Sequence, residues 1–217
     1  MKIKELIMDM ELFISFFLAS VTLSLMPGPD NVFVLTESIT KGKRNGIIIS
    51  TGLASGIIIH TMLIATGLSV LVQQSPYVFN GIKIFGAIYL IYLAYLTYKE
   101  ETLTINISKQ EIGLDINEKW FALYKKGFIM NVLNPKVTLF FIAFLPQFVS
   151  KDGLPFSVQI IVLGILFMLQ AFLVFSIIAI VSEKLRYFLN SSVFWRKVKW
   201  VKITILLLLA LFLIISP

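Results

Sequence analysis

Two proline-containing stretches place polar residues inside segments that are otherwise apolar. The first has the sequence PGPDN from Pro27 to Asn31, and no charged residue lies between Leu12 and Pro29. The second is Asn134-Pro135-Lys136. An acid or a lysine at the centre of a membrane-spanning helix costs about 2.5 to 3.5 kcal/mol, so such residues commonly mark a functional site. We therefore predict a substrate-binding or coupling site that comprises Pro27, Gly28, Pro29, Asp30, Asn31, Asn131, Asn134, Pro135 and Lys136.

The prolines also free backbone groups. Proline has no amide hydrogen and clashes with the carbonyl four residues earlier, so Pro27 and Pro29 free the carbonyls of Leu23 and Leu25. Free carbonyls cannot stay unpaired in lipid. We therefore expect this break to face protein or a water-filled cavity.

Each candidate residue also has a purely structural interpretation. Asp30 follows a proline and could simply cap the helix that begins there. Lys136 could neutralise Asp30 in a pair that never contacts a substrate. Asn31, Asn131 and Asn134 could satisfy the backbone groups that the prolines free. In the functional interpretation, Asp30 binds a substrate ammonium group or carries a proton, and Lys136 holds a substrate carboxylate.

His60 is the only histidine and lies deep in the second apolar segment. Histidine titrates near neutral pH, so His60 is a candidate proton relay, although one hydrogen bond in helix packing would also explain it. The chain has no cysteine, no His/Asp/Glu cluster with metal-ligand spacing, and no Ser-His-Asp or Walker pattern. We therefore expect no catalytic residue, metal or cofactor, and the lack of cysteine excludes disulfides and thiolate metal sites.

The composition is typical of an integral membrane protein. Of the 217 residues, 58% are hydrophobic, and the mean hydropathy is +0.90. A soluble domain is usually about 45–50% apolar. One span needs roughly 20 residues. The charge-poor segments predict a single membrane domain over residues 1–217 with six transmembrane helices, at about residues 12–36, 46–72, 77–98, 120–149, 156–182 and 198–216.

The basic residues gather on one side of the predicted bundle. Of the 19 Lys and Arg residues, 14 lie in, or at the span ends beside, the loops between spans 1 and 2, 3 and 4 (a polar loop at 99–119), and 5 and 6. The positive-inside rule places these loops in the cytoplasm and both termini outside it. The net charge of +7 is then an orientation signal, and we expect no nucleic-acid partner. Asp30 would lie nearer the cytoplasm than the midplane.

The two halves of the chain look related. Each half has three predicted spans, so the halves would have opposite orientations, as in the inverted repeats of many secondary transporters. We predict an all-α fold of two inverted three-helix repeats, residues 12–98 and 120–217, with helices 1 and 4 broken at prolines. A shift of 108 positions aligns Leu25 with Leu133, Pro27 with Pro135, Phe33 with Phe141 and Gly56 with Gly164.

Several motifs together resemble those of the LysE/RhtB family of amino-acid exporters. The resemblance covers about residues 13–148 by motif and the rest by hydropathy alone. Asp30 stands where asparagine is common in that family, so the acid would favour cationic substrates or alter proton coupling. The motifs are Pro27-Gly28-Pro29-Asp30-Asn31, Gly42-Lys43-Arg44-x-Gly46, Gly52-x-x-x-Gly56, Lys83-x-x-Gly86-Ala87-x-Tyr89, Gly127-x-x-x-Asn131-x-x-Asn134-Pro135-Lys136 and Pro146-Gln147-Phe148.

The resemblance implies a multi-pass protein of the bacterial inner membrane that exports amino acids or related small metabolites, driven by a gradient of protons or another cation. On this interpretation, freed carbonyls of Leu23, Leu25 and Asn131, together with Asp30, bind the substrate ammonium group. Lys136 attracts the substrate carboxylate, and protonation of Asp30 couples export to the proton gradient.

Other functions stay open at this point. An uncoupled channel or a membrane scaffold would also need apolar helices, whereas a membrane-embedded enzyme would need a catalytic cluster that the sequence does not contain. The expected partners are an amino acid or similar metabolite, a coupling cation and the lipid bilayer. Homo-oligomerisation is left open, because an apolar helix face meets lipid or a partner helix alike.

Overall fold

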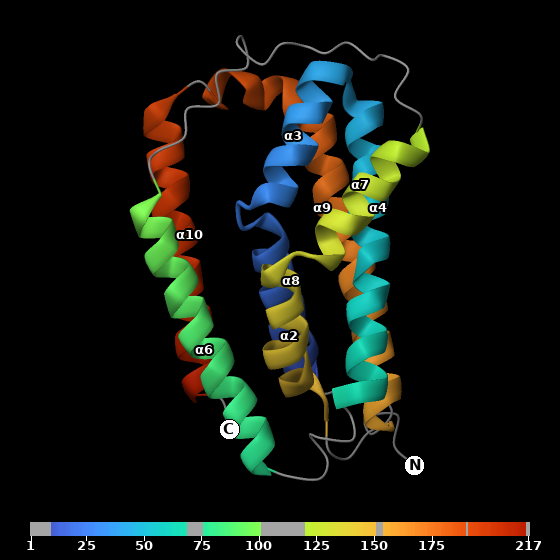
Figure 1. Cartoon of the computed structure of the whole chain (residues 1–217), viewed down its shortest axis with the longest axis vertical. Helices are drawn as coiled ribbons and strands as arrows, with labels where there is room; N and C mark the ends of the chain where they lie inside the picture. The colour runs from blue at the N-terminus through green and yellow to red at the C-terminus, as the bar shows by residue number, and fades with distance from the viewer. Residues whose placement is uncertain (1–9, 69–75, 101–119, 151–153, 190, 216–217) are drawn as a thin grey trace.

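The computed structural model describes residues 10–68, 76–100, 120–150, 154–189 and 191–215 of the chain. Within these ranges it is helical, without a strand (Figure 1). Four continuous segments are long and apolar enough to cross a membrane: Lys43–Gly67, Asn80–Lys99, Phe156–Ser182 and Ser192–Ile215. This confirms the predicted class of an all-α membrane protein. Most of the predicted polar loop, residues 101–119, lies outside the described residues.

Two further helix pairs are bent at the predicted prolines. Helix α2 (Met10–Leu25) meets α3 (Pro29–Lys41) at 56°. Helix α7 (Trp120–Val132) meets the segment Pro135–Phe148 at 46°. That segment consists of α8 (Pro135–Leu139), a π-helical turn η2 (Phe140–Phe144) and a 3-10 turn η3 (Leu145–Phe148). If each bent pair is one broken span, the described residues form up to six spans.

Several helices run further than the charge pattern predicts. Helix α3 continues to Lys41, α9 (Phe156–Leu189) passes the predicted end at residue 182, and α10 (Ser192–Ile215) begins six residues before residue 198. Charged residues stop a hydrophobic run but not a helix, because long basic side chains extend to the interface. The first break therefore separates helices of 16 and 13 residues. Because α3 ends at Lys41 and not at residue 36, the break lies further from this end of the span than predicted.

Helix α4 (Lys43–Leu63), continued by the π-helical turn η1 (Ile64–Leu68), packs against both α7 and α9. The contact with α7 is backbone to backbone. A Cβ atom on Gly52 would overlap the carbonyl of Tyr124, and one on Gly127 would overlap the carbonyl of Ile49. Small residues permit such close approach of membrane helices. This contact holds the second bent pair against the centre of the molecule.

Helices α6 (Pro76–Lys99) and α10 pack against each other at one side of the molecule (Figure 1). They meet the rest mainly beside η2 and η3. Phe212 of α10 stacks on Phe144 and Phe148, with ring centroids 6.1 and 6.3 Å apart. A Cβ atom on Gly86 would lie 2.6 Å from Cβ of Ala143. We call α6 and α10 together the α6–α10 pair.

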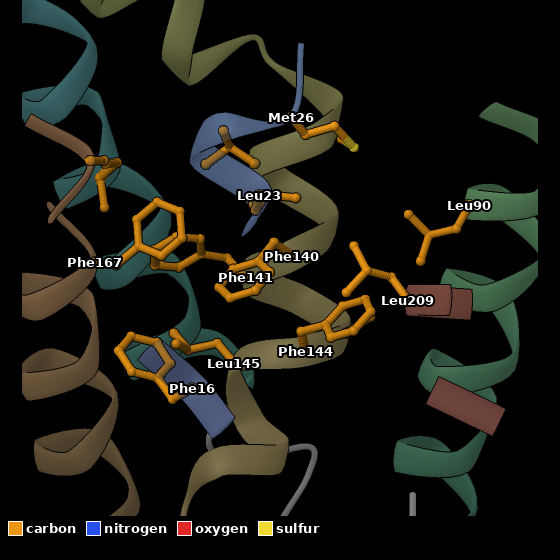
Figure 2. Packing of buried hydrophobic residues seen from close by; sticks show 14 of the residues in the cluster. Phe16, Leu23, Met26, Leu90, Phe140, Phe141, Phe144, Leu145, Phe167 and Leu209 are labelled. Carbon is orange, nitrogen blue, oxygen red and sulfur yellow. The ribbon is translucent and has the colours of Figure 1, made fainter. Parts of the chain in front are cut away.

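The apolar core surrounds the second broken helix. Phe140 and Phe141 of η2 contact Phe167 of α9, with ring centroids 5.1 and 5.3 Å apart. Figure 2 shows Phe144 pointing from the same turn toward Leu209 of the α6–α10 pair. These side chains are buried, and they fix the position of the segment that begins at Pro135.

Candidate functional site

Asn134 links the two broken helices. It caps the N-terminus of α8, because its Oδ1 accepts a hydrogen bond from the backbone N of Lys136 at 3.0 Å. Its Nδ2 donates to Oδ2 of Asp30 at 3.4 Å. Asp30 lies in the first turn of α3, where the helix dipole favours an acid. One amide side chain therefore both starts α8 and contacts the start of α3.

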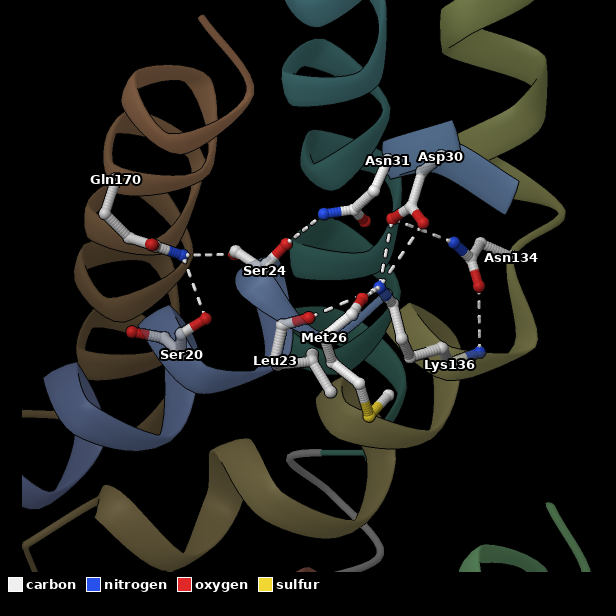
Figure 3. Close-up of polar contacts among 9 residues, drawn as sticks. All are labelled: Ser20, Leu23, Ser24, Met26, Asp30, Asn31, Asn134, Lys136 and Gln170. Carbon is white, nitrogen blue, oxygen red and sulfur yellow. Dashed lines mark hydrogen bonds and ion pairs between the residues drawn. The ribbon is translucent and has the colours of Figure 1, made fainter. Parts of the chain in front are cut away.

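Lys136 and Asp30 form a buried ion pair between these two helix starts (Figure 3). The Lys136 Nζ lies 3.1 Å from Oδ2 and 3.4 Å from Oδ1 of Asp30. It also donates to the carbonyl oxygens of Leu23 and Met26, both at 3.2 Å. Asp30 is 1% exposed and Lys136 is 9% exposed. The ammonium group is therefore held by acceptors from both sides of the first break.

Side chains of the protein contact two of the carbonyls that lose a helical partner at the prolines. Pro27 frees the Leu23 carbonyl, which accepts from Lys136. Pro135 likewise cannot donate to the Asn131 carbonyl, which accepts from the backbone N of Asn134 at 2.9 Å and also lies 3.2 Å from Nε2 of His60. Since a carbonyl only accepts, this contact places the histidine proton on Nε2. The sequence therefore identified acceptors at both breaks, but not the groups that fill them.

A second polar cluster lies beside the first break. Asn31 Nδ2 donates to the carbonyl of Ser24 at 2.9 Å. Gln170 of α9 donates from Nε2 to Ser24 Oγ at 2.9 Å and to the Ser20 carbonyl at 3.3 Å. Sequence reasoning missed both serines, because serine is common on helices that merely pack closely. It also named the carbonyl of Leu25, whereas those of Ser24 and Met26 accept side-chain hydrogen bonds here.

A small cavity of about 10 Å³ lies against the ion pair, which is room for about one water molecule. Three buried amide oxygens near the breaks have no hydrogen-bond partner among the residues that the structure describes: Asn31 Oδ1, Asn131 Oδ1 and Gln170 Oε1. Asn131 lines this cavity together with Asp30 and Lys136. The open hydrogen-bonding positions are thus acceptors, which suit a donor such as water or an ammonium group.

Gly28 lies directly against the ion pair. A Cβ atom there would be 2.7 Å from Asp30 Oδ1 and 3.4 Å from Lys136 Nζ. Its φ of −155° and ψ of 178° are extended values that any residue adopts. Glycine is therefore required by the close contact and not by the backbone conformation.

Apart from the three prolines, the predicted site residues fall into three contacting groups. Asp30, Asn134, Lys136 and Gly28 meet at the ion pair. Asn131 contacts His60 through its backbone carbonyl. Asn31 donates to the backbone carbonyl of Ser24 in its own span. Within the ranges that the structure covers, no three His, Cys, Asp or Glu side chains are placed to hold a metal ion.

Comparisons with known proteins identify relatives of this chain and its family. A membrane protein of Vibrio cholerae serotype O1, named only as an uncharacterized membrane protein, is 30% identical over 193 residues, which is 87% of this chain and 90% of that one. Leucine efflux proteins of Salmonella choleraesuis and Salmonella typhimurium are each 31% identical over 137 residues, 63% of this chain and 62% of theirs. No solved structure matches the chain significantly. The family model described as LysE type translocator matches residues 21–217, which include both breaks and the ion pair between them, so the chain belongs to the LysE type translocator family.

Proposed function

We propose that the protein is a secondary active exporter that moves amino acids or related small metabolites out of the cytoplasm, driven by the proton gradient. The observation that carries the proposal is the buried Asp30–Lys136 pair where two broken helices meet. Secondary transporters typically place their sites between such breaks. The family membership and the similarity to leucine efflux proteins support an amino acid as the substrate.

The contacts of Lys136 suggest how the amino group of a substrate binds. The α-ammonium group of an amino acid carries three N–H donors, as the lysine ammonium group does. The acceptors on Leu23, Met26 and Asp30 would suit either one. We infer that the substrate ammonium displaces Lys136 from these acceptors. The Lys136 ammonium group then pairs with the substrate carboxylate, so that Lys136 and Asp30 each keep a partner of opposite charge in the buried site.

The same geometry suggests exchange of substrate for a proton. Asp30 contributes the only formal negative charge in this group of contacts. A proton on Asp30 removes that charge and weakens the binding of an ammonium group. Substrate and proton would therefore exclude one another at Asp30. Mutually exclusive binding at one alternately exposed site is the requirement for antiport.

We further propose two inverted repeats, residues 12–98 and 120–217, in the inner membrane, with both termini outside the cytoplasm. Helix α4 packs on α7, and α9 packs correspondingly on α2 and α3. In such a repeat α4 corresponds to α9, and α6 corresponds to α10. The α4–α9 and α6–α10 contacts therefore each join a helix to its own counterpart. Figure 1 places the start of α2 and the end of α10 at the same end of the molecule. These pairings support the repeat and the shared side.

Transport by purified protein in liposomes tests the function. Leucine is supplied on both sides at equal concentration, and a pH gradient is imposed across the membrane. The wild-type protein is expected to accumulate leucine against its gradient, and Asp30→Asn is expected to abolish this accumulation. Glu37→Gln is the matched control, because Glu37 is an acid on the same helix that pairs with Lys41 instead of Lys136.

Three outcomes separate the alternatives. Leucine that only equilibrates, in wild type and with any gradient, indicates an uncoupled channel. Uphill accumulation that persists in Asp30→Asn removes Asp30 from the coupling step but leaves the exporter. No leucine flux of either kind in reconstituted wild type contradicts export of leucine.

A further inference from the structure

A cavity of about 260 Å³ lies between the first break and the α6–α10 pair. Pro27, Gly28 and Pro29 line it on the side of the break, with Val32 of α3 beside them. The lining from the α6–α10 pair is Thr97, Glu100, Trp195, Val198, Lys199 and Lys202. Cavities that bind drug-sized ligands are usually about 300–1,000 Å³, so this volume suits a smaller molecule. We call this space the access cavity.

The access cavity carries both signs of charge. The Nζ of Lys202 lies 3.5 Å from Oε2 of Glu100. Lys199 donates from Nζ to the backbone carbonyl of Glu100 at 2.6 Å. The side chain of Glu100 is 55% exposed and that of Lys202 is 22% exposed, so a ligand can reach both. A carboxylate and two ammonium groups beside an apolar wall match an amino acid that carries both charges and an apolar side chain.

At the other end of the α6–α10 pair, away from the residues that line the access cavity, the pair packs directly on η2. Beside η2, Gly86 and Ala143 are in close contact, and Leu213 lies beside the same glycine. The cavity therefore lies toward the helix ends that carry Glu100 and Lys199. By the distribution of basic residues, those ends face the cytoplasm.

Gly28 lies between the access cavity and the buried ion pair. It lines the cavity, and its missing side chain would point at Asp30 Oδ1 and Lys136 Nζ. We propose that the access cavity is the first binding site of the exported amino acid, and that the substrate passes Gly28 to reach Asp30. This inference rests on the proposed export function. It also specifies the substrate as a zwitterion with an apolar side chain, which contacts Val32, Val198 and Trp195.

A second surface hollow competes for this role. It has a volume of about 600 Å³ and contacts the breaks at Pro29, Asn134 and Pro135. Among the described residues that line it, Lys126 is the only charged one, and all the others except Asn134 are apolar: Pro29, Phe33, Ile129, Met130, Leu133 and Pro135. A zwitterion that entered there would find a cation for its carboxylate but, among these residues, no anion for its ammonium group. The charges therefore favour the access cavity.

Single cysteine variants test the proposal, because the natural chain has no cysteine to remove. Val198→Cys and Val32→Cys place the thiol in the access cavity, whereas Val201→Cys is the matched control on the outer face of α10, where Val201 is 53% exposed. The probe is a membrane-impermeant cationic methanethiosulfonate, applied to membrane vesicles of each orientation with and without leucine. The probe reacts with the thiolate, which forms where water reaches the thiol and not in apolar surroundings. The cavity cysteines should therefore react at least about tenfold faster than the control on the outer face of α10.

The expected result has two parts. Both cavity cysteines react only from the side that carries Lys199, and leucine slows that reaction, whereas lysine slows it less. Glu100→Gln in the Val198→Cys background raises the leucine concentration needed for protection. Equal reaction at Val198→Cys and Val201→Cys, or reaction that leucine does not slow, overturns the access cavity as a binding site.

This readout is independent of transport. If reconstituted wild type exports leucine but leucine does not protect Val198→Cys, the export function stands and the access cavity is wrong. If leucine protects Val198→Cys but no uphill transport occurs, the binding site stands and the proposed export fails. The two failures are therefore distinguishable.

Discussion

The ion pair between Asp30 and Lys136 gives an asymmetric prediction about its two partners. In Lys136→Met, the Asp30 carboxylate stays buried and retains, among the described residues, only the donor Asn134 Nδ2 at 3.4 Å. Removing one partner of a buried pair costs about 3–5 kcal/mol. For a chain of this size, about 1 kcal/mol shifts Tm by about 2–4 °C, so we expect Tm to fall by about 6–20 °C.

Removal of the acid should cost less. In Asp30→Asn, the ammonium group keeps the carbonyl oxygens of Leu23 and Met26, both at 3.2 Å. The lost charge-assisted contact is then worth about 1–3 kcal/mol. In the double variant Asp30→Asn/Lys136→Met, neither charge is buried, and replacing a buried ion pair by neutral groups is often nearly neutral. We expect the double variant to be more stable than Lys136→Met alone.

Thermal unfolding in detergent measures this cycle, with the fluorescence of Trp120, Trp195 and Trp200 as the signal. Lys41→Met is the control for loss of a lysine, because the Lys41–Glu37 pair is partly exposed and such pairs contribute about 0–1 kcal/mol. The reasoning is refuted if Asp30→Asn costs more than Lys136→Met, or if the double variant loses the sum of both. Leucine export decides the role of the pair: a stable double variant that exports normally would make the pair structural only.

Three further substitutions test individual contacts. Gly28→Ala places a methyl group 2.7 Å from Asp30 Oδ1. This displaces the Asp30 carboxylate, so leucine efflux should fall at least about tenfold. Gly81→Ala, where the added methyl group meets open space, is the control and should leave efflux unchanged. Gly127→Ala forces α7 away from α4, and overpacking of this kind costs about 1–3 kcal/mol; a normal Tm and membrane yield would contradict the backbone contact. His60→Phe removes the histidine contact of the Asn131 carbonyl, but this carbonyl keeps the backbone N–H of Asn134 at 2.9 Å, so the loss should be about 0.5–1.5 kcal/mol by thermal unfolding; His60→Gln should recover part of this, and an unchanged pH dependence of efflux in both variants would exclude a proton relay.

The sequence predicted the class of fold and the position of both breaks, because each depends on local chemistry. A proline inside a continuous helix would remove a hydrogen bond, so Pro27 and Pro135 mark the breaks without knowledge of the fold. A buried acid and a buried lysine are costly, so Asp30 and Lys136 were expected to pair or to serve a site. The structure brings them together at 3.1 Å.

The other features of the site depend on contacts between residues that are far apart in the sequence, and local sequence patterns do not predict such contacts. The periodicity of an apolar helix does not distinguish the face that meets protein from the face that meets lipid. The contacts of Gln170 with Ser20 and Ser24 were therefore not predictable, nor was the choice of the Met26 carbonyl over that of Leu25. The helix ends were also misjudged, since α10 carries Arg196, Lys197 and Lys199 within its first turns.

The lysine that fills the first break has a consequence for synthesis of the protein. Lys136 follows Leu23 by 113 residues and Asp30 by 106 residues. Translation at about 5–20 residues per second delays its arrival by about 5–20 seconds. During that interval the first half carries an acid and open carbonyls that lipid cannot satisfy. The nascent first half therefore has to stay in contact with water or the insertion machinery, and emergence of the second half is the event that completes the first.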